Sequence, residues 1–418
     1  MVENRRRLPF QLGLACFALL WASAALSQPK PSAAPTADPA AKGRSLIRIG
    51  RLKEAEDALR QAAQARGQSI EALYDLARVQ FASGSYPKSR LACKALVEKE
   101  PDAALSNLCM ARAFLVWRRA ARAEEYVAKA RETDPRRAEV FQVLGDLKRI
   151  EGDVAASKAA YQEVLRIDPR DPDAQFGLGQ LFLITPDPSA AQLAFRAALA
   201  QEPGWPEALY ELGRLTGGAE AISLLQRAVA ARPNWSEARL ALGAAQLANG
   251  DVASAEALFR EVLKAYPTHP MAHARLGMAL GAKHDYAHAE TELKRGLAGL
   301  PNDADAALAL ARVYARTDRP EDAFEAYRNT ANLEPGGSRA LVEAGVYALE
   351  LGRNTLAQAF LEKAVEHTPK SATAQARYAD ALLARGEKAQ AKEHYRLSLA
   401  AEGAIDRQDV QRRLDAVK

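Results

Sequence analysis

Histidines are concentrated in one stretch of the chain, THPMAHARLGMALGAKHDYAH, which spans residues 268–288 and holds four of the six. They form two pairs with the i, i+4 spacing that can place two metal ligands on one face of a helix: His269 with His273, and His284 with His288. The step from one pair to the next corresponds to about 16 Å along a helix, so the four imidazoles cannot meet at one ion. Each pair alone lacks a third ligand, apart from Asp285 or Glu290. We therefore interpret these residues as surface histidines and predict no metal site.

Cysteine is the second residue type whose side chain could take part in chemistry. Cys93 and Cys109 are the only cysteines after residue 27. They lie on consecutive predicted helices, and in an exported protein, where thiols are oxidised, they could form a disulfide. Cysteine also packs as a small, buried hydrophobic side chain. The sequence leaves both interpretations open, and we favour two small buried side chains.

Other side chains that serve in catalysis are scattered singly along the chain. We find no nucleophile motif, no glycine-rich phosphate-binding loop and no paired carboxylates. The charges nearly balance, with 57 Lys and Arg against 52 Asp and Glu, whereas nucleic-acid-binding proteins usually present a basic face. The sequence therefore predicts a protein that is not an enzyme, holds no cofactor and does not bind nucleic acid.

The N-terminus has the organisation of an export signal. Three arginines at residues 5–7 precede a stretch without charged residues at 8–26, and small residues stand one and three places before Gln28. This order is typical of a secretory signal peptide. We predict that residues 1–27 are such a signal peptide, with an uncleaved membrane anchor as the alternative, and that residues 28–41, rich in Pro and Ala, form a linker. The protein is accordingly expected in the periplasm or secreted, or anchored in the inner membrane.

Prolines punctuate the rest of the chain at a fixed interval. The series is Pro101, Pro135, Pro169, Pro203, Pro233, Pro267, Pro301, Pro335 and Pro369. Every interval is 34 residues except that from Pro203 to Pro233, which is 30. A proline inside a helix costs about 3 kcal/mol, so the series must mark the ends of helices. The prediction is a chain of repeated helical units.

Glycines mark a second boundary inside each unit. Gly84, Gly152, Gly250 and Gly352 each stand 17 residues before a proline of the series, and glycine just past a helix end adopts the left-handed conformation that terminates the helix. Each unit is thus predicted to be helix, turn, helix, turn. Helices of about 13 residues are marginal alone, so they must be stabilised by packing against their neighbours.

Small and large residues alternate at fixed positions of these units. The segment FQVLGDLKRIEGDVAASKAAYQEVLRIDP, for example, places Gly145 on the first helix, Ser157 and Tyr161 on the second, and Pro169 at the end. In this register the units resemble tetratricopeptide repeats, whose signature spans 34 residues. The resemblance covers residues 36–405. It implies an all-α fold, an α-solenoid forming a right-handed superhelix of about eleven helix-turn-helix units.

The register of the resemblance divides the chain into parts. We predict regular units at 42–205, one shortened unit at 206–235, regular units at 236–405 and a capping helix at 406–418. Four residues are missing between Thr216 and Ala221 in the shortened unit. We expect a change of superhelical pitch there, with a merely tolerated deletion as the alternative. Trp205 and Trp235 occupy equivalent positions before a first helix, where we expect them to fasten the turn to the helix.

The first helix of each unit lines the concave side of the superhelix in this family. The predicted groove residues are Tyr74, Arg78, Phe81, Leu108, Arg112, Leu115, Phe176, Tyr210, Arg214 and Arg312. Such a groove is mostly apolar with arginines, which suits an extended or helical peptide that carries hydrophobic anchors and acidic residues. The alternative is that part of this row is buried between repeats.

These expectations point to a non-enzymatic protein–protein interaction scaffold in the bacterial envelope. Its expected partner is a protein or peptide held along the concave face, and it contacts a membrane only if the N-terminal segment is an uncleaved anchor. The alternative function is a membrane-anchored structural or assembly subunit of an envelope machine, such as a pilus or exopolysaccharide export apparatus.

Overall fold

The computed structural model describes residues 39–65, 70–333, 338–401 and 403–417. The predicted signal peptide lies outside the described residues, as does the linker up to residue 38. The last three residues of the predicted linker, 39–41, already belong to the first helix, which begins at Pro39. No helix in the described ranges has the length and apolar character needed to cross a membrane.

All the described secondary structure is helical apart from isolated turns and one bridge residue. The helices are α1 (Pro39–Arg48), α2 (Leu52–Ala65), α3 (Ile70–Ala82), α4 (Tyr86–Lys99), α5 (Ala104–Val116), α6 (Ala120–Thr133), α7 (Ala138–Glu151), α8 (Val154–Ile167), α9 (Pro172–Ile184), α10 (Pro188–Gln201), α11 (Pro206–Leu215), α12 (Gly218–Ala231), α13 (Ser236–Ala248), α14 (Val252–Ala265), α15 (Pro270–Ala282), α16 (Tyr286–Gly299), α17 (Ala304–Arg316), α18 (Pro320–Leu333), α19 (Ser338–Glu350), α20 (Asn354–His367), α21 (Ala372–Ala384), α22 (Lys388–Ala400) and α23 (Arg407–Ala416).

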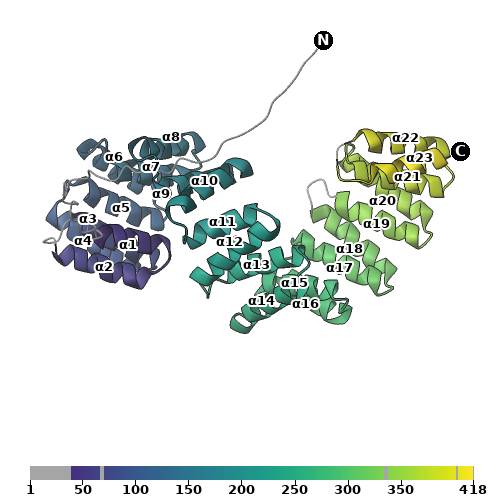
Figure 1. Ribbon diagram of the computed structural model, residues 1–418, viewed down its shortest axis with the longest axis horizontal. Coiled ribbons are helices and arrows are strands. Elements are labelled where there is room, and N and C mark those ends of the chain that lie inside the picture. Colours follow the sequence, from purple (N-terminus) through teal and green to yellow (C-terminus); the bar gives the residue numbers. More distant parts are fainter. Residues whose placement is uncertain (1–38, 66–69, 334–337, 402, 418) are drawn as a thin grey trace, which may run out of the picture.

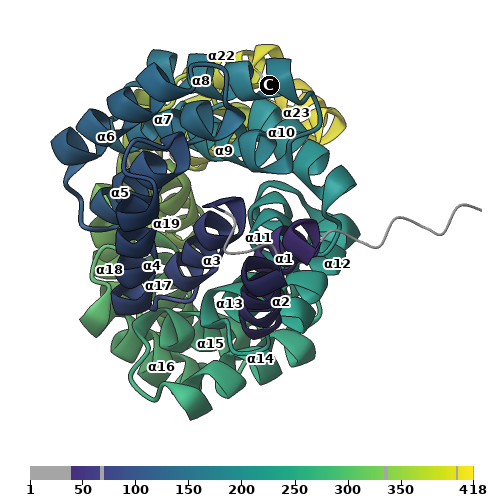
Figure 2. The same ribbon diagram turned by 90° about the vertical axis from the view of Figure 1, so that its left-hand side faces the viewer.

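Consecutive helices pair into hairpins, from α1 with α2 to α21 with α22, and each hairpin packs on the next. The hairpins form one curved array (Figure 1), and a view along it shows them winding around the axis of a superhelix (Figure 2). In most units the first helix of a hairpin also contacts the first helix of the next hairpin. The first helices therefore form a wall, with weaker direct contact from α9 to α11 and from α17 to α19. The fold is the α-solenoid that the resemblance implied, and α23 covers its last hairpin.

Within a hairpin, large side chains of the second helix pack against small residues of the first helix. A Cβ atom on Gly145 would stand 2.6 Å from the ring of Tyr161, and one on Gly243 would stand 2.5 Å from the ring of Phe259. Both rings are fully buried. Because such distances are too short for two carbon atoms, only glycine allows the two helices to approach this closely.

Replacing Gly243 by leucine is expected to lower the free energy of unfolding by about 1–3 kcal/mol, because the new side chain must displace the ring of Phe259. The matched control is Gly281→Ala on α15, where a Cβ would meet no atom closer than 3.9 Å. There the gain in helix propensity should stabilise the chain by up to about 1 kcal/mol. Urea unfolding followed by circular dichroism measures both changes. Equal stability of the Gly243→Leu chain and the wild type would contradict the close approach.

The turn inside most units contains a left-handed residue. Gly152, at the end of α7, has φ of 82°. In three of the units that lack this glycine, Arg118, His284 and Asp318 stand at the equivalent position with φ of 53°, 64° and 55°. The turn geometry is thus kept even where the residue is not glycine, at a cost in backbone strain.

Cys93 on α4 and Cys109 on α5 form a disulfide, with their Cα atoms 5.3 Å apart. Both side chains are fully buried. The interpretation favoured from the sequence, two small buried side chains, was right about burial but wrong about the bond. The two helices are adjacent in the stack, which brings the sulfur atoms together.

The shortened unit loses residues from its first helix. α11 has 10 residues, whereas α9 and α13 on either side have 13. The chain then turns at once into α12, which begins at Gly218 with φ of 59°. The first helix of this unit is therefore shorter than the first helices on either side of it in the wall. The change of superhelical pitch expected here stays a prediction.

Candidate functional site

The predicted groove residues do not all reach the surface of the wall. Tyr74 and Leu108 are only 3% and 0% exposed, so the prediction that they contact a partner is wrong. They lie where α3 and α5 pack on their neighbours, in one core cluster. For these positions the alternative interpretation, burial between repeats, is correct.

Phe176 and Tyr210 are half-buried and serve as contacts between units. Phe176 stacks on Trp205 with ring centroids 4.5 Å apart, and Tyr210 lies 4.6 Å from Trp235. Each tryptophan precedes a first helix and packs against the aromatic residue of the first helix before it. The tryptophans thus fasten successive first helices together, which is more than the local contact expected from the sequence.

Four predicted residues come together in one hollow near the N-terminal end. Arg78, Phe81, Arg112 and Leu115 line it with Asp146, and its volume is about 470 Å³. The two arginines, however, are engaged in the protein itself. Arg78 lies 3.3 Å from both Asp75 and Asp173, and Nε of Arg112 donates to the hydroxyl of Tyr74 at 3.0 Å.

The charges around Arg78 compensate one another. Burial alone would raise the pKa of the Asp173 carboxyl, but the guanidinium groups of Arg48 and Arg78 hold that pKa below its ordinary value. Removing one member of such a buried group leaves its partners with less compensating charge, which is unfavourable. Arg78 and Arg112 therefore have a structural role in the chain itself, and their role as anchors for a partner's acidic residues stays a prediction.

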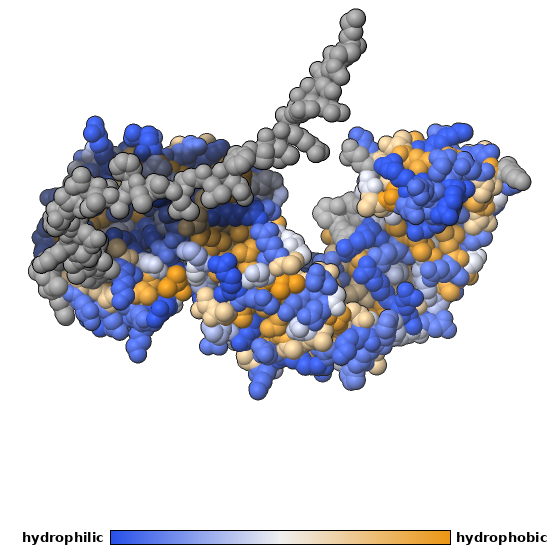
Figure 3. Space-filling model, in the orientation of Figure 1, coloured by the Kyte–Doolittle hydropathy of each residue, from blue (hydrophilic) through white to orange (hydrophobic). Residues whose placement is uncertain are grey.

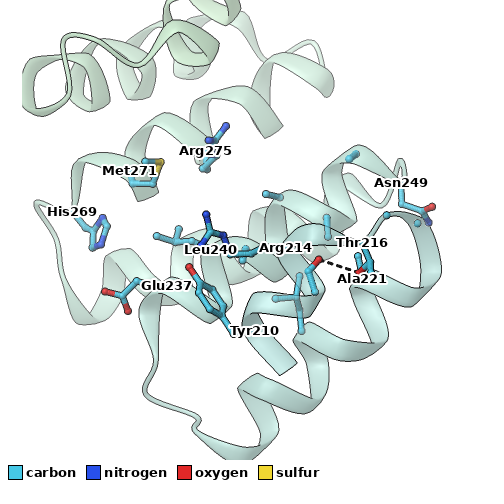
Figure 4. A pocket seen from close by; sticks show the side chains of 18 residues that line it. Tyr210, Arg214, Thr216, Ala221, Glu237, Leu240, Asn249, His269, Met271 and Arg275 are labelled. Atoms are coloured by element: carbon cyan, nitrogen blue, oxygen red, sulfur yellow. Dashed lines mark hydrogen bonds between the residues drawn. The ribbon is translucent and has the colours of Figure 1, made fainter. Parts of the chain in front are cut away.

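A larger hollow opens beside the shortened unit, with a volume of about 670 Å³. It includes Tyr210 and Arg214 of the predicted set. Alanines of α13, among them Ala241 and Ala244, form much of its floor together with Leu240. Figure 4 shows Tyr210, Arg214 and Leu240 on one side of the hollow and His269, Met271 and Arg275 on the other.

Arg214 lies at the edge of this hollow. Its side chain is 53% exposed and lies 3.2 Å from Glu211 on the same helix. Its guanidinium carbon stands 5.3 Å from the centroid of the Tyr210 ring, a distance at which the cation is attracted to the ring face.

Two further hollows of about 390 Å³ each continue along the wall from α15 to α21. Arg312 and Arg316 of α17 line both of them. Arg312 is half exposed and forms a two-bond pair with Glu343 of α19, at 2.7 and 2.5 Å. We call the three hollows together the C-terminal groove. Figure 3 shows apolar areas interspersed with hydrophilic ones on the visible face of this part of the array.

The sequence analysis did not select several residues of the C-terminal groove. Arg275, Arg316 and Tyr347 line it, and none was in the predicted set. The signal for Arg316 was present, because it follows Arg312 by four residues on one helix face. No such signal existed for Arg275, which becomes visible only because the shortened unit opens the wall in front of it.

The four clustered histidines are each occupied locally. Nδ1 of His273 lies 2.5 Å from Glu292 and its Nε2 lies 2.9 Å from the carbonyl oxygen of Pro267. Nδ1 of His284 lies 2.7 Å from the hydroxyl of Tyr286. Within the part of the chain that the structure describes, no group of three or more His, Cys, Asp or Glu residues is placed to hold a metal ion.

Family models identify the repeats. One tetratricopeptide repeat model matches residues 46–112 and 218–278, and a second matches residues 143–205, 275–336 and 342–405. Together the matches span well over half of the chain. The chain belongs to the tetratricopeptide repeat family. No curated protein matches its sequence.

Several solved structures are similar to this tetratricopeptide repeat protein. Yeast Tom70 is 13% identical, with 91% of this chain and 94% of that chain covered and a TM-score of 0.48. PilF of Pseudomonas aeruginosa is 16% identical, with 50% and 96% covered and a TM-score of 0.42. PilW, a type IV pilus biogenesis factor, is 21% identical, with 46% and 90% covered and a TM-score of 0.40. These values are too low to transfer a function from one protein to another.

Tetratricopeptide repeats generally bind protein or peptide partners, so membership of the family supports a protein–protein interaction scaffold. The geometry adds where such a partner has room. Arginines of both regions pair with the protein's own carboxylates, but the side chains of Arg214 and Arg312 in the C-terminal groove are 53% and 52% exposed, whereas those of Arg78 and Arg112 in the N-terminal hollow are 18% and 22% exposed.

Proposed function

We propose that this protein is a non-enzymatic scaffold that binds an extended or helical segment of a partner protein in the C-terminal groove. The observation that carries the proposal is the hollow beside the shortened unit, where an apolar floor lies open between Arg214 and Arg275. A concave site with an apolar floor and few polar groups at its edge is the usual form of a binding pocket. The repeats supply a rigid wall, so a partner binds to a surface that is already formed.

The charges of the groove select the partner segment. Five arginines line the three hollows, against three glutamates: Arg214, Arg275, Arg312, Arg316 and Arg377, with Glu237, Glu343 and Glu350. The groove therefore carries a small positive excess. We infer that the segment presents apolar anchors together with Asp or Glu, since charge complementarity favours the correct partner and excludes basic ones.

We place this function in the bacterial envelope. Disulfides persist in oxidising compartments such as the periplasm, and the buried Cys93–Cys109 bond supports export of the chain. Mass spectrometry of the mature N-terminus tests this part of the proposal. A chain that begins near residue 28 supports a soluble envelope scaffold, whereas residues 8–26 still attached would favour the membrane-anchored assembly subunit. A cytoplasmic chain with both thiols reduced would contradict either location.

Charge reversal at Arg316 tests the groove directly. Arg316 is exposed and lines two of the three hollows, so we expect Arg316→Glu to weaken an acidic, apolar peptide about tenfold, roughly 1.4 kcal/mol. Peptides are first selected from a displayed library against the full chain, and their affinities are then measured by fluorescence anisotropy.

The matched control is Arg328→Glu. Arg328 is also exposed but lies on α18, the second helix of the same hairpin, outside the residues that line the groove. It should leave the affinity unchanged. Selected peptides that lack acidic residues, or an equal effect of the two reversals, would overturn the proposed site.

A further inference from the structure

The first hairpin contacts units that are far from it in the sequence. The guanidinium of Arg48, the last residue of α1, donates two bonds to Asp173 of α9, from Nε at 3.1 Å and from Nη2 at 2.9 Å. Its Nη1 donates to Glu202 at 2.9 Å. The hydroxyl of Ser45 donates to the other oxygen of Glu202, also at 2.9 Å. One helix of the first unit thus contacts the open end of the fifth hairpin, where α9 begins and α10 ends.

This contact closes the N-terminal part of the array upon itself. In Figure 2, α1 lies close to α11 and α12. A Cβ on Gly204, in the turn between α10 and α11, would stand 3.4 Å from Ile49. A Cβ on Gly50, the residue after Ile49, would stand 3.6 Å from Arg232 and 3.7 Å from Pro206. Because a solenoid unit packs mainly against its immediate neighbours, a contact from the first unit to the fifth and sixth is an additional constraint.

The ion pairs of Arg48 with Asp173 and Glu202, which close the turn, are well shielded from solvent. The side chains of Arg48, Asp173 and Glu202 are 14%, 20% and 15% exposed. Arg78 shares Asp173, and Arg44 pairs with Asp75 at 2.7 Å. Bidentate, charge-assisted hydrogen bonds such as those between Arg48 and Asp173 are strong and directional.

Few apolar contacts accompany these bonds. The apolar residues near α1, such as Leu46, pack with Leu59 and Val79 in its own hairpin and in α3. Across the closure, the apolar contacts described are those of Ile49 with the Gly204 turn and of Gly50 with Pro206. Separating the two faces would break ion pairs and hydrogen bonds but would not open a hydrophobic core. The closure is therefore reversible without unfolding either side.

We propose that Arg48, Asp173 and Glu202 form an ionic latch, which holds the N-terminal turn of the superhelix closed. When these ion pairs break, the turn opens by a hinge motion between repeats. Closed, the latch fixes the spacing between the first hairpin and α9–α11, and it confines the hollow lined by Arg78 and Arg112. Open, the turn widens and the carboxylate of Glu202 loses both its partners. The latch goes beyond the proposed binding function, because Arg48, Asp173 and Glu202 do not belong to the residues that line the C-terminal groove.

Charge reversal at Arg48 tests the latch in the full chain. Spin labels are attached through Lys53→Cys on α2 and Ala200→Cys on α10, both exposed positions, with Cys16→Ser to remove the remaining thiol. Double electron–electron resonance then gives the distance distribution across the closure. We expect one narrow, short distance in the otherwise wild-type chain, and a shift of most of the population to longer, broader distances in Arg48→Glu.

The control is Arg51→Glu, three residues away. Arg51 is 57% exposed and pairs with Glu54 on its own hairpin, so its reversal should leave the short distance in place. If Arg48→Glu fails to fold, as judged by circular dichroism, the neutral Arg48→Gln replaces it and is expected to give a smaller shift in the same direction. An unchanged short distance in the folded Arg48 variants, or a broad distribution already in the wild-type background, would overturn the latch.

Discussion

Removing the Cys93–Cys109 disulfide is expected to lower the free energy of unfolding of the second and third hairpins by about 3 kcal/mol. The bond joins residues 16 positions apart, and a loop of about that length loses roughly this amount of conformational freedom in the unfolded chain when it is closed. The effect should be local, because a repeat array is stabilised by contacts between neighbours and its units can unfold separately. Hydrogen exchange of the amides in α4 and α5, with and without reductant, measures it.

The double variant Cys93→Ala/Cys109→Ala separates the bond from the packing. Both sulfur atoms are fully buried, so the variant loses the bond and some packing at once, whereas reductant removes only the bond. Amide exchange in the variant should be fast and indifferent to reductant. Exchange in the wild type that reductant does not accelerate, or two free thiols in the oxidised protein, would contradict the disulfide.

The ends of the helices could be predicted from the sequence because they depend on local chemistry. Proline begins α9, α10, α11, α15 and α18, and aspartate caps the start of several helices, as Asp171 does by accepting from the amide of Ala174 at 2.7 Å. A fixed repeat then extends such assignments to units with weaker signals. His284 illustrates the limit, since only the repeat reveals that it fills a left-handed turn position rather than a ligand site.

The candidate site was less predictable because it depends on contacts between distant units. The 34-residue period shows that Tyr74 and Tyr210 are equivalent, but it does not show that Tyr74 is buried and Tyr210 faces a hollow. The difference lies in the neighbouring units: Tyr74 is enclosed in a core cluster and bonded by Arg112, whereas Tyr210 packs on Trp235 at the edge of the hollow. In the same way, Arg78 resembled a free groove arginine until Asp173, 95 residues away, was found beside it.

Replacing Ala244 by tryptophan should block the C-terminal groove. Ala244 is half-buried on α13 and belongs to the floor of the 670 Å³ hollow, so an indole can extend from it into the space between Tyr210 and Met271. We expect the affinity for a selected acidic, apolar peptide to fall roughly thirtyfold, about 2 kcal/mol, the loss typical of a central contact in an interface. Fluorescence anisotropy with the full chain provides the measurement.

The control for this substitution is Ala257→Trp on α14, the second helix of the same hairpin, where the side chain is exposed and lies outside the groove. The two variants make the same chemical change in one unit and differ only in the face that carries the indole. Because Ala244 is not fully buried, the first variant should unfold at the same urea concentration as the second, so a loss of affinity cannot be attributed to a loss of fold. Peptide that binds both variants equally well would show that the hollow beside the shortened unit does not hold the partner, even if the remaining groove does.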